Sequence, residues 1–215
     1  MRLTQSERMR RMDAENEAVW EAAEVNTGPR LRHIYPTLLR APIEVIVCPL
    51  GKAVNHGGIL RAADSFRIER VTFQKEEDGA TDFAGSRGAK KWQPYRWLNA
   101  LDAAKEAKEN GRTLVSLTWT TDAVSIYDFE WQFPLSIVAG SEWQGVPDEI
   151  VDMSDHVIAI PMFGATGSLN VAVATSIVLS QATMAFHRIN PAFIPARAES
   201  QQLLGIEPPV EETTL

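Results

Sequence analysis

Residues 135–186, LSIVAGSEWQGVPDEIVDMSDHVIAIPMFGATGSLNVAVATSIVLSQATMAF, decide the fold. An apolar strand over 135–139 stops at Gly140, and a second one over 156–160 stops at Pro161. A glycine-rich loop then leads into a long uncharged helix, which we expect to open at Ser168. Two strand ends and a helix start therefore fall close together, where backbone amides are free to bind a ligand. We expect the ligand site here.

Apolar strands alternate with helical patterns along the preceding chain. We predict strands over residues 43–48, 70–73 and 113–117, and helices over 55–66 and 100–110. Asn55 is a suitable N-cap for the first helix, and Gly111 closes the second. Mostly apolar strands that alternate with helices predict an α/β fold, with a largely parallel sheet flanked by helices.

The sequence divides into three parts. Residues 1–42 form an extension with a polar helix over 4–25, and residues 43–188 form the main domain. Residues 189–215 are rich in proline and acidic towards the end, so we expect a tail that is extended or disordered.

The composition and the apolar segments indicate the cellular compartment in which we expect the protein. The single cysteine, Cys48, lies in an apolar run and excludes an intramolecular disulfide, which favours a reducing compartment and a buried thiol. The start of the sequence shows no pattern typical of an export signal, so we predict a cytoplasmic protein. The uncharged stretch between Asp155 and Arg188 is broken by polar residues and glycines, which favours a buried helix over a membrane span.

The net charge and the distribution of charge give opposite indications about nucleic-acid binding. The net charge of −7 argues against a phosphate-bearing partner, because phosphate binding depends on Lys and Arg. However, the segment 85–97, GSRGAKKWQPYRW, contains Arg87, Lys90, Lys91 and Arg96 among aromatic residues and has no acid. Such a mixture suits single-stranded nucleic acid, or alternatively a solvated loop whose aromatics pack on the core.

Several common chemistries find no support in the sequence. No strand is followed by G-x-G-x-x-G, and the loop 140–145 continues with Val-Pro instead of the Lys and Ser or Thr of a phosphate-binding loop. The four histidines show no metal-ligand spacing, so we predict no metal site. The G-x-S-x-G motif of hydrolases does not occur.

Three motifs in order resemble those of the SpoU (TrmH-like) branch of the SPOUT RNA methyltransferases. They are N-x-G-x-x-x-R-A-A from Asn55, V-A-G-S-E-x-x-G-V from Val138, and the pair I-A-I-P-M from Ile158 with S-L-N-V-A-V-A from Ser168. The resemblance covers about residues 43–188. It implies an α/β domain with a C-terminal trefoil knot, a homodimer built around the knot, and transfer of a methyl group from S-adenosylmethionine to a ribose 2′-hydroxyl in tRNA or rRNA.

The resemblance also implies roles for individual residues. The positions that match the cofactor-binding residues are Gly140, Ser141, Ile160, Met162 and Leu169. The positions that match the polar active-site set are Asn55, Arg61, Glu142, Ser168 and Asn170. Four of these five polar residues also have an ordinary structural explanation: Ser168 as a helix N-cap, Asn170 as a first-turn residue, Glu142 as a surface carboxylate, and Arg61 as the partner of Asp64.

Arg61 has two possible roles in the implied reaction. Arginine at this position is sometimes described as a general base, but a guanidinium group does not readily give up its proton. Clamping the adjacent phosphate and stabilising developing negative charge suits it better. For RNA contact we select Arg61, Arg87, Lys90 and Lys91.

The sequence departs from the family pattern at two places. Arg67 follows Phe66 where relatives commonly have glycine, so we expect a different turn there, and Trp143 follows Glu142 where smaller or charged residues are common. Two other functions stay open: a catalytically silent RNA-binding or assembly protein on the same fold, and a methyltransferase acting on small molecules or proteins.

Overall fold

The computed structural model describes residues 35–75 and 83–194. The polar helix predicted over residues 4–25 and most of the predicted tail lie outside these ranges. Seven strands form one sheet in the order β3-β2-β1-β6-β4-β7-β5, and every adjacent pair is parallel. The strands are β1 (Ala41–Val47), β2 (Ile68–Phe73), β3 (Tyr95–Trp97), β4 (Thr113–Leu117), β5 (Val124–Ser125), β6 (Leu135–Ala139) and β7 (His156–Ala159). The predicted parallel sheet is confirmed.

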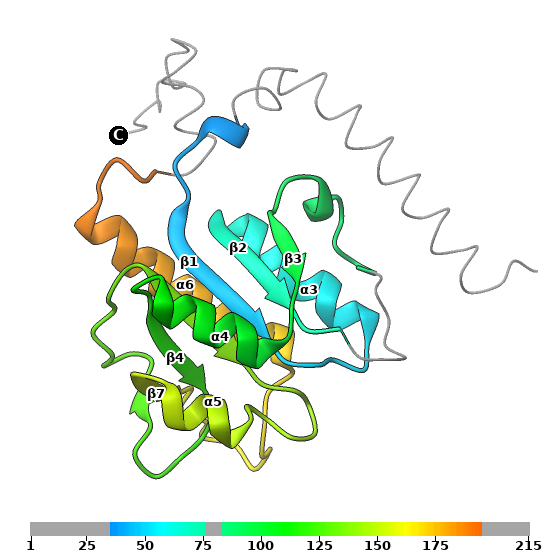
Figure 1. The fold of residues 1–215 in the computed structure, drawn as a ribbon, viewed down its shortest axis with the longest axis vertical. Coiled ribbons are helices and arrows are strands. Elements are labelled where there is room, and N and C mark those ends of the chain that lie inside the picture. The colour runs from blue at the N-terminus through cyan, green and yellow to red at the C-terminus, as the bar shows by residue number, and fades with distance from the viewer. Residues whose placement is uncertain (1–34, 76–82, 195–215) are drawn as a thin grey trace, which may run out of the picture.

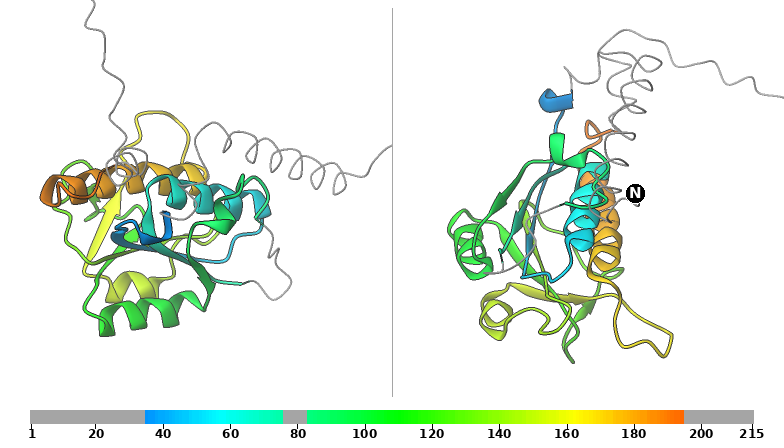
Figure 2. Two further views of the ribbon diagram at one scale, coloured as in Figure 1. Left: turned by 90° about the horizontal axis from the view of Figure 1, so that it is seen from above. Right: turned by 90° about the vertical axis from the view of Figure 1, so that its right-hand side faces the viewer.

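Helices cover both faces of this sheet. α3 (Ala53–Ser65) and α6 (Val171–Ile189) lie on one face, and α4 (Ala100–Glu109) and α5 (Asp148–Met153) lie on the other, with the strands between them (Figures 1 and 2). Two short 3-10 helices, η1 (Tyr35–Thr37) and η2 (Ala89–Lys91), flank the sheet-forming segments. Among the helices of the described residues, none combines the length and apolar character that a membrane crossing requires.

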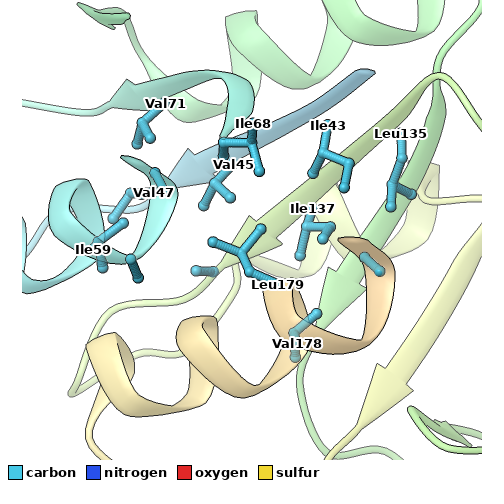
Figure 3. Packing of buried hydrophobic residues seen from close by; sticks show 14 of the residues in the cluster. Ile43, Val45, Val47, Ile59, Ile68, Val71, Leu135, Ile137, Val178 and Leu179 are labelled. Carbon is cyan, nitrogen blue, oxygen red and sulfur yellow. The ribbon is translucent and has the colours of Figure 1, made fainter. Parts of the chain in front are cut away.

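Side chains along a strand point alternately to the two faces of the sheet, and apolar side chains form a hydrophobic core on each face. Ile43, Val45 and Val47 of β1 pack with Leu179 of α6 and Ile59 of α3 in the larger core (Figure 3). The intervening residues of β1 face α4, where Ile46 packs in a second core that also holds Cys48. Burial raises the pKa of the Cys48 thiol to about 12, which fits the predicted role of a small buried apolar residue.

Several predicted element boundaries require correction. α3 begins at Ala53, so Asn55 lies inside the helix and is not its N-cap. α6 begins at Val171, and its N-cap is Asn170, whose side chain accepts hydrogen bonds from the N–H groups of Ala172 and Val173. Ser168 therefore lies in the loop before the helix. The sequence Ser-Leu-Asn offers two good capping residues, and the later one caps the helix.

The turn between α3 and β2 explains the departure at Arg67. Arg67 has φ of 48°, a left-handed conformation that glycine adopts more easily. Its guanidinium Nη2 donates to the carbonyl of Ile194 at 2.9 Å, and its Cζ lies 4.6 Å from the centre of the Phe193 ring. Phe193 is buried and packs on Phe186. The first residues of the predicted tail are therefore packed on the domain, which corrects the expectation of an extended or disordered segment for residues 190–194.

A buried carboxylate joins the central strands on the α4 face. Glu44 of β1 is fully buried and accepts hydrogen bonds from Arg70 Nε at 2.9 Å and Thr72 Oγ1 at 2.7 Å. Arg96 and Arg112 approach the same carboxylate to 3.3 and 3.8 Å. Burial by itself would raise the pKa of Glu44, but the hydrogen bonds from Arg70 and Thr72 and the charges of Arg70 and Arg112 outweigh it and lower the pKa. This Glu44 cluster holds four segments of the sheet together.

Candidate active site

A pocket of about 290 Å³ lies at the carboxyl edge of the sheet. The loop after β6 forms one wall, and the segment that enters α6 forms the other. Because neighbouring strands are parallel, β4 and β6 end side by side here, which is where open α/β sheets usually bind ligands. The expected location of the ligand site is therefore confirmed as the location of a pocket.

Close packing of α3 against α6 brings distant residues to this edge. Gly58 of α3 faces Ala172 of α6, and a Cβ atom at Gly58 would lie only 3.0 Å from the Ala172 Cβ. The missing side chain lets the two helices approach closely. As a result Asn55, near the start of α3, meets Asn170, the N-cap of α6, although 115 residues separate them.

Three polar side chains form a directed chain of hydrogen bonds at the pocket. Asn170 uses its Oδ1 to cap α6, so its Nδ2 is left to donate, and it donates to Asn55 Oδ1 at 3.0 Å. Asn55 in turn donates from its own Nδ2 to a carboxylate oxygen of Glu142. The helix cap thus fixes which way both amides point, and the carboxylate at the end of the chain must act as acceptor. We call this arrangement the Glu142–Asn55–Asn170 chain.

The loop that carries Glu142 is a closed turn. Ser141 and Gly145 exchange two backbone hydrogen bonds, of 2.9 and 3.1 Å, directly after β6. The foot of the turn packs on Gly140, where an added Cβ would lie 2.3 Å from the Gly145 carbonyl carbon. Only glycine fits at this position, so the turn is held firmly against the end of the strand.

The structure brings most of the predicted site residues together. Among the cofactor-binding candidates Gly140, Ser141 and Leu169 line the pocket, and among the active-site candidates Glu142, Ser168 and Asn170 do so. Asn55 is buried behind them and reaches the site through its bonds to Glu142 and Asn170. Ile160 packs against the larger core and Met162 is 40% exposed, and neither lines this pocket.

Sequence reasoning missed several residues that line the pocket. They are Leu117, Ala139, Gly145, Val171 and Ala174, and all but Leu117 stood in the quoted motifs without an assigned role. Leu117 and Ala139 are the last residues of β4 and β6. Because ligands tend to bind at strand ends, the predicted strands could have indicated both residues. Val171 and Ala174 lie in the first turn of α6, whose start was placed too early.

Arg61 lies on α3 and does not line the pocket of its own chain. Its side chain is exposed. The ordinary explanation that it pairs with Asp64 finds no support, because the Asp64 carboxylate instead accepts a hydrogen bond from the Tyr35 hydroxyl at 2.7 Å. Six residues along a helix put Arg61 about 9 Å beyond Asn55 in the direction of the axis.

The basic aromatic segment contains residues that pack in the interior and residues that are exposed. Arg96 is bonded to Glu106 at 2.8 Å and to Thr72 at 2.9 Å, so it belongs to the interior network around Glu44. Tyr95 and Trp97 pack against the larger core, as the alternative interpretation of this segment held. Arg87, Lys90 and Lys91 are exposed.

The arrangement defines a class of protein: a parallel α/β domain with a pocket at the carboxyl ends of its strands, between a hydrogen-bonded turn and a helix N-terminus. Comparison with known proteins is more specific. The model of the SpoU rRNA methylase family matches residues 42–180. The chain therefore belongs to this family.

Individual relatives agree with that assignment. A tRNA (guanosine(18)-2′-O)-methyltransferase of Aquifex aeolicus is 36% identical over 131 residues, which cover 60% of this chain and 62% of that protein. The chain thus spans about three fifths of that relative's length. The crystal structure of the A. aeolicus TrmH/SpoU tRNA modifying enzyme matches with a TM-score of 0.69 and 26% identity, over 82% of this chain and 93% of that one.

A further solved structure shares the fold. The AdoMet-bound rRNA methyltransferase from Sinorhizobium meliloti matches with a TM-score of 0.62 over 74% of this chain and 60% of that chain. At 23% identity it supports the fold alone.

Proposed function

We propose that this protein is an S-adenosylmethionine-dependent RNA methyltransferase that modifies a ribose 2′-hydroxyl in tRNA or rRNA. The observation that carries the proposal is the Glu142–Asn55–Asn170 chain, which places an oriented carboxylate at the pocket. Family membership and the names of the relatives supply the reaction class.

The pocket has the character expected for the proposed cofactor. Leu117, Val171 and Ala174 supply apolar surface, while the backbone at Gly140 and Leu169 supplies polar groups that can bond the edge of a base. A side chain at Gly140 would displace the neighbouring turn, so glycine is needed to keep that turn beside the pocket. When bound, S-adenosylmethionine supplies a methyl group on a sulfonium, which is already a strong electrophile.

The chain's own residues would position the acceptor hydroxyl. A carboxylate oxygen of Glu142 can accept a hydrogen bond from a ribose hydroxyl and take up the proton of that hydroxyl, because an ionised carboxylate has acceptor capacity beyond its single bond to Asn55. Asn170 and Asn55 keep that carboxylate in one orientation. Correct placement of reacting groups can supply about 7–11 kcal/mol of a reaction barrier in favourable systems.

Arg61 is proposed to bind the phosphate beside the target ribose and to stabilise negative charge as it develops. Its position on α3, outside the pocket of its own chain, suits a contact with the RNA backbone. In the proposed homodimer, built around the C-terminal region, Arg61 of one subunit would serve the pocket of its partner.

The proposed RNA surface extends from Arg61 to the loop before β3. Gly57 lies one turn before Arg61 on the same side of α3, and the carbonyl of Ala84 occupies the space where a Gly57 side chain would project. The segment with Arg87, Lys90 and Lys91 therefore begins beside the helical face that carries Arg61. Reversing the charge at Lys90 and Lys91 should weaken RNA binding and flatten its salt dependence, and an unchanged salt slope would exclude this surface.

The test of the reaction is direct. Purified protein is incubated with methyl-labelled S-adenosylmethionine and total RNA, and the RNA is digested to nucleosides. Label on a 2′-O-methylnucleoside supports the proposal. Label on protein or on a small molecule supports the rival methyltransferase, and RNA binding without label supports a silent RNA-binding protein.

Mixing two inactive variants tests where Arg61 acts. Arg61→Ala and Glu142→Ala should each lose turnover while they still bind the cofactor. If Arg61 serves the partner's pocket, mixed dimers regain part of the activity because one of their two sites is complete. If it serves its own pocket, each mixed site lacks one residue and no activity returns.

The remaining expectations stay part of the proposal. They are the trefoil knot, the division into residues 1–42, 43–188 and 189–215, action in the cytoplasm, and the cofactor contacts of Ile160 and Met162. Fractionation of cells would test the compartment, and cofactor affinity measured for Ile160→Ala and Met162→Ala would test the two contacts.

A further inference from the structure

Trp143 is an exposed side chain on a rigid backbone. Its exposed fraction is 94%, yet it stands at the tip of the turn closed by the two backbone hydrogen bonds between Ser141 and Gly145. The Ser141 hydroxyl accepts a third hydrogen bond, from the N–H of Gln144, at 3.0 Å. The indole is therefore presented outward from a fixed point, and little backbone freedom is lost if it binds something.

The turn places Trp143 next to the proposed chemistry. Glu142, the preceding residue, lines the pocket and accepts the hydrogen bond from Asn55. A group that contacts Trp143 would thus lie one residue away from the carboxylate at the end of the polar chain.

The neighbours of Trp143 favour a flat ligand over an apolar protein surface. Glu142 and Gln144 on either side are both exposed and polar, so the indole does not sit in a continuous apolar stretch of chain. Protein interfaces centre on contiguous apolar patches, whereas an indole flanked by polar side chains can stack on the face of a base.

Other exposed aromatics follow neighbouring strands at the same edge. Trp119 comes two residues after β4, Tyr127 two residues after β5 and Phe163 four residues after β7, with exposed fractions of 75%, 60% and 100%. Since these strands are parallel, all three loops emerge at the edge that holds the pocket. Aromatic side chains on separate loops are the means by which proteins hold successive unpaired bases.

We propose that Trp143 stacks on an unpaired base of the substrate RNA, at or beside the nucleotide whose ribose enters the pocket. The inference rests on the proposed function, and it assigns Trp143 as a positioning residue for that substrate. Its indole holds the nucleotide in place while Glu142, oriented by Asn55 and Asn170, binds the ribose hydroxyl.

The experiment measures RNA binding without methyl donor. Fluorescence anisotropy with labelled unfractionated tRNA compares the wild type with Trp143→Ala, Trp143→Phe and the matched control Gln144→Ala, which changes the next side chain on the same turn. Stacking predicts roughly 5- to 150-fold weaker binding for Trp143→Ala, substantial rescue by phenylalanine, and no change in the control. Cofactor affinity and the melting temperature should stay at wild-type values.

Two results would overturn the inference. One is equal RNA affinity for Trp143→Ala and the wild type. The other is a change of oligomeric state in Trp143→Ala, measured by light scattering, because it would assign the indole to a contact between copies of the chain. The proposed function fails in a different way, through absence of label on RNA with the wild-type protein.

Discussion

Two carboxylates, Glu44 and Glu142, lie in opposite surroundings. Glu44 is fully buried on the interior strand β1 and is bonded to Arg70 and Thr72, with two more arginines nearby. Glu142 is exposed on a turn and accepts a hydrogen bond from the neutral amide of Asn55. Arginines and hydroxyl groups use up the hydrogen-bonding capacity of the first carboxylate, so it stabilises the sheet. The carboxylate of Glu142 is oriented by a neutral amide and not by a cation, so it can still bind a ligand.

The largest expected effect concerns stability. Glu44→Ala leaves Arg70, Arg96 and Arg112 around a site without its anion, and removing one partner of a buried ion pair costs about 3–5 kcal/mol. Urea unfolding of the variant and the wild type measures the difference. A loss under about 1 kcal/mol would mean that the Glu44 cluster contributes little to the fold, and the contrast with Glu142 would fail.

Glu142→Gln should show the reverse pattern. Because the change keeps size and leaves an exposed turn in place, the melting temperature should stay within the error of the wild type. Methyl transfer should fall about 100-fold or more, since an amide cannot draw a proton from the ribose hydroxyl. Gln144→Ala is the matched control and should leave turnover unchanged. Full activity in Glu142→Gln would remove the carboxylate from the proposed chemistry.

Asn170 allows the two roles to be separated at a single position. Asn170→Ala loses the N-cap of α6 and should cost about 1 kcal/mol of unfolding free energy. Asn170→Asp keeps an oxygen for the cap but cannot donate to Asn55 Oδ1. We therefore expect near wild-type stability and reduced turnover for the aspartate variant, measured by thermal unfolding and label transfer. Equal turnover in the aspartate variant and the wild type would contradict the directed chain.

The smallest effect is a change in acid sensitivity. The pKa of Glu44 is lowered in the folded state, so its contribution to stability is present above its unfolded pKa, about 4.3, and is lost as the pH falls through the lower, folded-state pKa. The stability of the wild type should therefore fall more steeply below pH 4.3 than that of Glu44→Gln. Urea midpoints at a series of pH values test this, and parallel curves would contradict it.

The sequence was most informative where local pattern and chemistry coincide. The apolar run before Gly140 and the turn around Glu142 predicted both a strand end and the pocket wall. The Glu44 cluster gave no such sign, because Glu44 lies in an otherwise apolar strand and Arg70 and Arg96 are 26 and 52 residues away. The strands β3 and β5, with three and two residues, are too short for an alternating pattern to show.

Assembly of the chain follows from the position of β6. This late strand pairs with β1 on one side and β4 on the other, so the centre of the sheet closes only after residues far apart in sequence have met. The hydrogen bonds of Asn55 also need partners that lie 87 and 115 residues further along the chain. Folds dominated by such distant pairings form slowly, since loop closure precedes the contacts that reward it. During refolding, catalytic competence should consequently return with the last kinetic phase and not with the early collapse.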